Sequence, residues 1–207
     1  MIRRVDDFVI YDDMQYTRRD WRNRNIIKTA NGPLWLTIPV EVKGKYFQAI
    51  KDTRISDAGW NLAHWKTICH AYGKAPHFKA YRECLEDLYA RATFPLLSEV
   101  NHHFLVAICG LLGIKTRLHW SMDFQLAPGK SERLLALCQD LHASHYVSGP
   151  AAKDYLDEAL FARQGISVEW MDYSKYPEYP QLHPPFAPAV SILDLIFSVG
   201  ERAPEFF

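Results

Sequence analysis

The sequence predicts an α/β fold, with a mainly parallel sheet, flanking helices and a helical insertion at about residues 59–112. The main observation is that short β-prone runs alternate with segments of helical spacing from residue 96 onward, as in successive βα units. A second is the apolar run at residues 8–11, which is typical of a buried strand. The 207 residues suffice for one domain with a proper core, so we expect a single domain over residues 1–207.

The first predicted strand, residues 8–11, ends in two adjacent acidic residues, Asp12 and Asp13. Carboxylates at the carboxyl end of a strand can polarise a substrate or act as acid and base, and both are therefore catalytic candidates. The alternative interpretation is a solvated turn.

A basic segment follows, in which Arg22, Asn23 and Arg24 come directly after Trp21. Guanidinium groups bind phosphate or sugar through forked hydrogen bonds, and these three residues are therefore candidates for substrate binding. The segment is too short for a nucleic-acid surface. The alternative is that its arginines pair with Asp12, Asp13 and Asp20.

Two β-prone runs, residues 26–29 and 34–40, flank an Asn31-Gly32 pair that predicts a hairpin. Another β run is expected at residues 47–55. Helices are predicted at residues 60–72, 76–91 and 96–112 from their apolar spacing.

His64 lies on the first of these predicted helices and is an acid/base candidate. The histidines of this helix are not paired at i, i+4, and the four cysteines form no CxxC motif, so the sequence predicts neither a metal site nor disulfide bonds.

Lys and Arg total 24, as do Asp and Glu. This balance argues against nucleic acid as a partner. Without a signal peptide or a long apolar run, we expect a cytoplasmic protein with no membrane span.

The stretch of residues 129–158 reads as loop, helix, short strand, loop and helix. Ser131 is the expected N-cap of a helix that runs to about Leu141, residues 145–147 form a strand, and residues 151–161 form the second helix. Two loop-to-helix junctions would then face one another at the carboxyl edge of the sheet, where a positive helix end suits an anionic ligand.

Candidates for binding a phosphate or sugar at these junctions share a polar or charged side chain beside a predicted loop. They are Lys130, Ser131, Arg133, Ser148, Lys153 and Tyr155. The sequence GKS does not belong to a P-loop, because Phe124 stands where that motif needs glycine. The alternative is an ordinary βα connection with two surface lysines.

Beyond a predicted strand at residues 166–171, a strip rich in proline and aromatic residues covers residues 172–188 and cannot form regular structure. It either wraps a surface or forms one wall of a ligand cleft. Tyr179, Gln181 and His183 are the binding candidates in this strip. A short helix is expected at residues 190–199.

Three segments together resemble the WbqC-like protein family: VDDFVIYDDMQYTRRDWRNRN, the stretch from GKSERLL to EWMDY, and YPEYPQLHPPFAPAVSILDLIFSVG. The middle segment HWKTICHAYGKAPHF also fits, so the resemblance covers essentially the whole chain. Members usually begin with a further strand and helix, and we expect this chain to lack them.

The family is associated with gene clusters for O-antigen and other surface polysaccharides, including lipopolysaccharide. The resemblance therefore implies a transferase that attaches an amino-acid or acyl group to a nucleotide-linked amino sugar. The expected partner is a sugar nucleotide or another small anionic ligand, and no cofactor is indicated. No nucleophile, base and orienting group can be assigned together, so a non-catalytic binding module and an adenylate-forming amide ligase remain alternatives.

Overall fold

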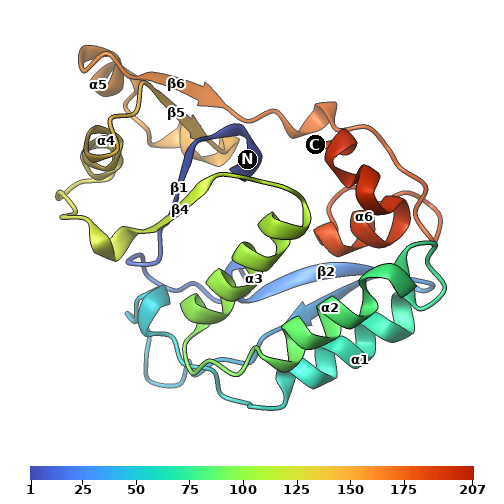
Figure 1. Ribbon diagram of the computed structural model, residues 1–207. Helices are drawn as coiled ribbons and strands as arrows, with labels where there is room; N and C mark the ends of the chain where they lie inside the picture. The colour runs from blue at the N-terminus through green and yellow to red at the C-terminus, as the bar shows by residue number, and fades with distance from the viewer. The chain divides into compact units, whose positions relative to one another are not determined.

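The computed structural model describes residues 1–207, which form two compact units. The first unit consists of Met1–Asp13 and Ile114–Lys175, and the second of Met14–Gly113 and Tyr176–Phe207. Each unit therefore combines segments that are far apart in the sequence (Figure 1).

The first unit contains two separate pairs of parallel strands. β1 (Asp7–Ile10) pairs with β4 (Arg117–Trp120), and β5 (His145–Ser148) pairs with β6 (Ser167–Trp170). Two helices connect the strands, α4 (Ser131–Asp140) before β5 and α5 (Glu158–Arg163) before β6. Four short 3-10 helices complete the unit: η1 (Ile2–Arg4), η4 (Ser121–Asp123), η5 (Pro150–Asp154) and η6 (Tyr173–Lys175).

The apolar core of the first unit lies between β5, β6 and the two helices. Its buried members come from α4, α5 and the adjoining loops: Leu135, Cys138, Leu156, Phe161 and Ile166. Phe161 stacks on Tyr146 of β5 with ring centroids 5.3 Å apart. The residues of β1 and β4 do not belong to this core.

The second unit combines an antiparallel hairpin with four helices. The hairpin pairs β2 (Arg24–Thr29) with β3 (Gly32–Thr37), and Gly32 supplies the positive φ of 102° that its tight turn requires. The helices are α1 (Trp60–Tyr72), α2 (Phe78–Ala90), α3 (Leu97–Leu111) and α6 (Ile192–Val199). The 3-10 helices are η2 (Trp21–Asn23), η3 (Ile50–Asp52) and η7 (Gly200–Phe206).

Aromatic rings dominate the core of the second unit. Phe197 of α6 contacts Tyr72 and Phe78, with ring centroids 5.2 and 5.1 Å away. Asp194, which is fully buried, accepts a hydrogen bond of 2.9 Å from the Tyr72 hydroxyl. That hydroxyl in turn accepts one of 2.8 Å from the main-chain N–H of Lys28, so α1, α6 and β2 are tied together through one tyrosine.

The α/β class is confirmed, with parallel strands where strand and helix alternate. Two expectations were wrong. Residues 47–55 form η3 and isolated bridges in place of a strand. Residues 151–161 do not form one helix, because the chain leaves η5 at Tyr155 and α5 begins only after its N-cap Asp157.

None of the helices is long and apolar enough to cross a lipid bilayer.

Candidate functional site

The carboxyl ends of β1 and β4 bring two carboxylates and a hydroxyl together in the first unit. The Ser121 hydroxyl lies 2.7 Å from a carboxylate oxygen of Asp13 and 3.3 Å from one of Asp12, within donating distance of both. Asp12 is only 2% exposed, so it does not lie in a solvated turn. Because parallel pairing aligns the ends of the two strands, residues about 110 positions apart in the sequence meet at one edge.

The start of α4 and the end of η5 are joined by the side chain of Ser131. Its hydroxyl donates to the carbonyl of Tyr155, with an oxygen–oxygen distance of 3.4 Å, and accepts from the N–H of Asp157 at 3.0 Å. The N-cap of α4 is Lys130, and Ser131 is the first helical residue, so the predicted capping role of Ser131 was wrong. Its hydroxyl instead fixes one loop-to-helix junction to the other.

Both predicted lysines lie over aromatic rings of the same unit. The Lys130 ammonium is 5.6 Å from the centroid of the Tyr155 ring, and the Lys153 ammonium is 5.6 Å from that of Trp170. Lys130 and Lys153 are exposed, and Tyr155 is half-exposed. Such contacts are weak at a surface, so both ammonium groups are free to reach an arriving anion.

Two further candidates, Arg133 and Ser148, stabilise the first unit itself. Arg133 donates a hydrogen bond of 2.9 Å to the carbonyl of Ala127 in the loop before α4. Ser148, the last residue of β5, is buried. The hydrogen bond of Arg133 and the burial of Ser148 give both residues a structural role in the first unit.

Glu132 lies against Gly129 at the start of α4, so close that a side chain at Gly129 would collide with the carboxylate. Gly129 also has a positive φ of 95°. A carboxylate beside the first turn of a helix is stabilised by the free N–H groups and the positive dipole end. Glu132 therefore occupies the environment that an anionic ligand would use.

The remaining candidates belong to the second unit, where each of them has partners. Arg22 forms an ion pair with Asp20, in agreement with one of the alternatives from the sequence. The Asn23 amide is buried and donates to the carbonyl of Ile38 at 2.8 Å, while the Arg24 guanidinium lies 4.0 Å from the centroid of Trp35.

The side chain of His64, a residue of α1, contacts the β2–β3 hairpin and Trp60. Its Nε2 donates to the Thr37 carbonyl over 3.0 Å, and its ring lies edge-on to Trp60 with centroids 5.1 Å apart. Burial lowers the pKa of this imidazole below its usual value. A neutral imidazole with one engaged nitrogen retains Nδ1 for proton transfer.

The candidates in the tail fasten the strip to the second unit. Gln181 exchanges two hydrogen bonds with the main chain of Ala187, donating at 2.9 Å and accepting at 2.8 Å. His183 donates through Nε2 to the carbonyl of Ala71 at the end of α1. The Tyr179 hydroxyl accepts a longer hydrogen bond of 3.3 Å from the Gln181 amide. These contacts agree with a strip that wraps the surface.

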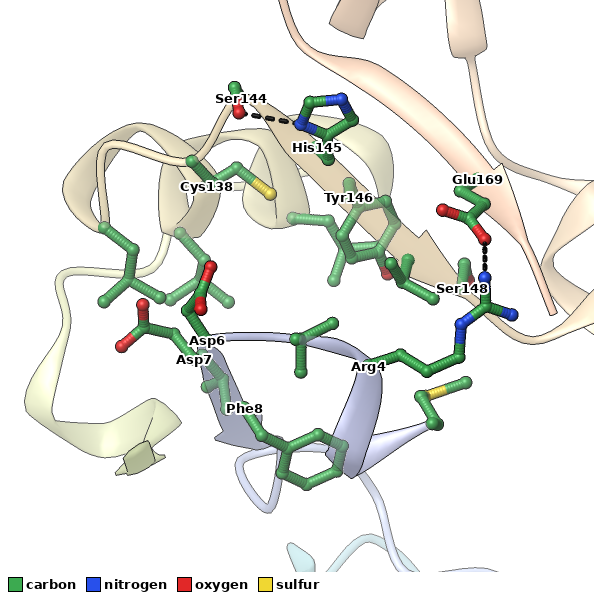
Figure 2. A pocket seen from close by; sticks show the side chains of 18 of the residues that line it. Arg4, Asp6, Asp7, Phe8, Cys138, Ser144, His145, Tyr146, Ser148 and Glu169 are labelled. Atoms are coloured by element: carbon green, nitrogen blue, oxygen red, sulfur yellow. Dashed lines mark hydrogen bonds and ion pairs between the residues drawn. The ribbon is translucent and has the colours of Figure 1, made fainter. Parts of the chain in front are cut away.

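A cavity of about 680 Å³ in the first unit was missed by the sequence analysis. It is lined by β1, β5 and α4, and the Arg4–Glu169 ion pair lies at its rim (Figure 2). Asp7 at its wall receives two hydrogen bonds of 2.7 Å from Arg117, which lower the pKa of that carboxyl to about 2. No local signal marks these residues, because their contacts depend on which strands become neighbours.

Comparisons with known proteins place the chain in a family. The model of the WbqC-like protein family matches residues 1–206, and the chain belongs to this family. An uncharacterized protein of Mycobacterium tuberculosis is 50% identical over 206 residues, a match that covers 100% of this chain and 89% of the relative. No solved structure matches.

Proposed function

We propose that the protein is a transferase of surface-polysaccharide biosynthesis, including that of O-antigen, which attaches an amino-acid or acyl group to a nucleotide-linked amino sugar. Family membership sets the context, and the observation that carries the proposal is the junction made by Ser131. This hydroxyl joins the start of α4, where Lys130 is the N-cap, to the residues that directly follow η5. η5 itself carries Lys153, and both lysines are exposed.

The diphosphate of the sugar nucleotide would bind beside Lys130 and Lys153. The start of a ten-residue helix offers free N–H groups and the positive end of its dipole, and the two ammonium groups add mobile positive charge. Tyr155, half-exposed beside Lys130, offers a ring on which a nucleobase or sugar can stack. Together these groups suit a ligand with both a negative charge and a flat face.

The acid and base would come from the carboxyl end of β1. An amino group attacks an acyl donor only after it has lost a proton, and Asp12 or Asp13 would accept that proton. Ser121, buried and within hydrogen-bond reach of both carboxylates, would keep them in position.

The decisive experiment is a mass-spectrometric screen of the purified protein with sugar nucleotides and a set of amino-acid and acyl donors. A product heavier than the sugar nucleotide by the added group supports a transferase. Binding without turnover would favour a non-catalytic module, and ATP consumption linked to amide formation would favour an adenylate-forming ligase.

The binding groups are tested by Lys130→Ala and Lys153→Ala. Each removes a charged hydrogen bond to phosphate, at a cost of about 1.5–3 kcal/mol, or roughly 10- to 150-fold in the dissociation constant measured by calorimetry. Lys66→Ala, an exposed lysine on α1, is the matched control and should leave affinity unchanged. Unchanged affinity in both test variants, with the fold intact, would place the anion elsewhere.

Glu132→Gln provides a test of opposite sign. The substitution keeps the size of the side chain and removes the negative charge that competes with phosphate at the start of α4. We expect tighter binding, by about two- to fivefold, because one charge near a helix end is worth about 0.3–1 kcal/mol. Weaker binding would show that Glu132 supports the ligand and does not compete with it.

A further inference from the structure

Residues 42–48 of the second unit, which we call the aromatic loop, hold two aromatic rings in solvent. The loop consists of two successive β-turns, closed by hydrogen bonds from the N–H groups of Lys45 and Gln48 to the carbonyls three residues earlier. Tyr46 and Phe47 are the central residues of the second turn. They are 77% and 84% exposed, and their rings lie edge-on with centroids 4.9 Å apart.

Local preference does not explain two aromatic residues at the centre of a turn. Such positions favour glycine, proline, asparagine, aspartate and serine, whose small or polar side chains suit the tight backbone. An aromatic ring stabilises a protein mainly through the surface that it buries, and Tyr46 and Phe47 are the two most exposed large hydrophobic residues of this chain. A local preference that is broken without a gain in burial is typical of a functional surface.

Hydrogen bonds fix the aromatic loop to the segment that precedes η2. The N–H of Tyr16 donates to the carbonyl of Gln48 over 2.9 Å, and the Gln15 amide donates to the carbonyl of Tyr46 over 2.9 Å. None of these bonds uses the ring of Tyr46 or Phe47. A partner can therefore bind both rings without first ordering the loop, which lowers the entropy lost on binding.

Cationic side chains accompany the two rings. The Arg18 guanidinium donates a hydrogen bond of 3.1 Å to a carbonyl of the first turn, which brings the basic segment before η2 against the loop. Arg19, Lys43 and Lys45 are exposed like Arg18, and of these four cations only Lys45 forms an ion pair, with Glu41. The aromatic loop thus combines exposed rings with positive charge that no carboxylate neutralises.

The net charge of zero for the whole chain does not weaken this local charge. The Debye length is about 8 Å at physiological ionic strength, so a charged surface responds to the side chains that touch it. The contacting side chains of the loop are positive.

The combination fits a lipid surface better than other partners. A small ligand needs a concave site that covers most of its surface, and a protein partner needs about 800 Å² on each side, which two rings on a turn cannot supply alone. At a membrane surface, aromatic rings settle at the level of the headgroups, while lysine and arginine contact anionic lipids.

We propose that the aromatic loop docks the second unit on an anionic phospholipid surface. Tyr46 and Phe47 insert among the headgroups, and Arg18, Arg19 and Lys43 contact the lipid phosphates. The protein lies on the membrane surface, and the contact is reversible because so few apolar groups are inserted. This docking belongs to the second unit and does not depend on the reaction proposed for the first.

The test measures co-sedimentation of the whole chain with vesicles made of equal amounts of phosphatidylglycerol and phosphatidylcholine. We expect binding to these vesicles and much weaker binding to vesicles of phosphatidylcholine alone. Binding should fall by about tenfold or more between about 0.01 and 1 M salt, because the Debye length decreases from about 30 to about 3 Å.

Two variants separate the apolar from the electrostatic contribution. We expect the partition coefficient to fall about tenfold in Phe47→Ser and about fivefold in Lys43→Gln. Leu62→Ser on α1 and Lys79→Gln on α2 change residues of the same kinds at exposed positions, and these matched controls should bind as the wild type does. Phe47→Trp should retain binding, since indole rings also favour the interface.

All of these positions are exposed, so the midpoint of thermal unfolding should remain unchanged and loss of binding would not reflect unfolding.

Four outcomes would overturn the proposal. The first is that the wild type does not bind the anionic vesicles. The second is that it binds them and the double variant of Phe47→Ser and Lys43→Gln binds equally well. The third is that the wild type sediments as a dimer and Phe47→Ser as a monomer, which would make a second copy the partner. The fourth is that alginate, a soluble acidic polysaccharide, requires Phe47 and Lys43 for binding whereas the vesicles do not.

Discussion

The two units of the chain satisfy their main-chain polar groups in different ways. In the second unit four helices close their own hydrogen bonds, and the hairpin of β2 and β3 forms between residues adjacent in the sequence. In the first unit both strand pairs are parallel, and β1 has to find β4 more than a hundred residues later. Helices and a hairpin therefore satisfy their main-chain groups with nearby residues, whereas a parallel sheet depends on distant segments.

The hydrophobic core of the first unit is also smaller than that of the second. The second unit buries aromatic rings from α1, α2 and α6 against one another, whereas the core of the first unit lies only around β5, β6, α4 and α5. A smaller core tolerates less loss of buried apolar surface. Removal of one central ring from each unit is therefore the most severe test of the comparison.

Phe161→Ala and Phe197→Ala each remove a ring that is fully buried. Either change should lower the free energy of unfolding by about 3–5 kcal/mol. We expect Phe161→Ala to unfold the first unit at 25 °C, while Phe197→Ala leaves the second unit folded but weakened. Hydrogen exchange of the amides in α4 and α1 reports on each unit separately.

The control for this pair is Phe47→Ala, since Phe47 is 84% exposed and its loss should change stability by no more than about 0.5 kcal/mol. Persistent protection of the α4 amides in Phe161→Ala would show that the first unit is as robust as the second.

One buried carboxyl and one ion-paired carboxyl give the units opposite responses to pH. Burial raises the pKa of Asp194 in the second unit. Its contribution to stability is therefore full below the unfolded pKa of about 3.9 and is lost as pH rises through the folded value. Asp194→Asn should lose less stability than the wild type between pH 4 and pH 7, measured by urea unfolding.

Asp7 in the first unit behaves in the reverse sense. Hydrogen bonds from Arg117 lower the pKa of this carboxyl to about 2, so its contribution is present above about pH 4 and is lost as the pH falls toward 2. Asp7→Asn should flatten that part of the stability profile only. Equal slopes in the variant and the wild type over this range would contradict the role of the ion pair.

Gln181→Ala tests how the tail is held. The substitution removes both partners of the Ala187 main chain and should lower stability by about 1–2 kcal/mol in a thermal or urea melt. Gln139→Ala, at an exposed position on α4, is the control. A loss of ligand affinity with unchanged stability would instead support the interpretation of the strip as a cleft wall.

The smallest effects are expected at the cysteines, which are all free in the structure. Cys84 is exposed, whereas burial raises the pKa of the Cys138 thiol to about 11. A thiol reagent should therefore modify Cys84 first and Cys138 last, and Cys84→Ser should change stability by less than about 0.5 kcal/mol. Mass spectrometry of the partly modified protein gives the order, and early labelling of Cys138 would reveal local opening of α4.

Helices that carry their own apolar stripe and a clear end were predicted correctly from the sequence. Elements that depend on contacts with distant residues were predicted less accurately. Helices α1, α2 and α3 were placed within two residues because each carries an apolar stripe and a clear end. The run at residues 47–55 was misread as a strand, since its β-prone residues satisfy their main chain through η3 and isolated bridges. The break between η5 and α5 was missed because Asp157 was not recognised as an N-cap.

Site prediction shows the same limit. The importance of Ser131 was recognised, but its bonds to Tyr155 and Asp157 require two loops to meet. The division of the candidate site residues between two units was not foreseen, because no linker marks the crossing points of the chain. The Asp7–Arg117 pair was likewise hidden, since its partners are 110 residues apart.

The contact between Lys153 and the Trp170 ring has a practical consequence. An ammonium group beside an indole perturbs its excited state. An anion that draws Lys153 away would therefore change the fluorescence of Trp170. Trp120 is the other tryptophan of the first unit, and the remaining four belong to the second. With Trp120 replaced by Phe, Trp170 would be the single tryptophan of the first unit, beside the proposed phosphate site.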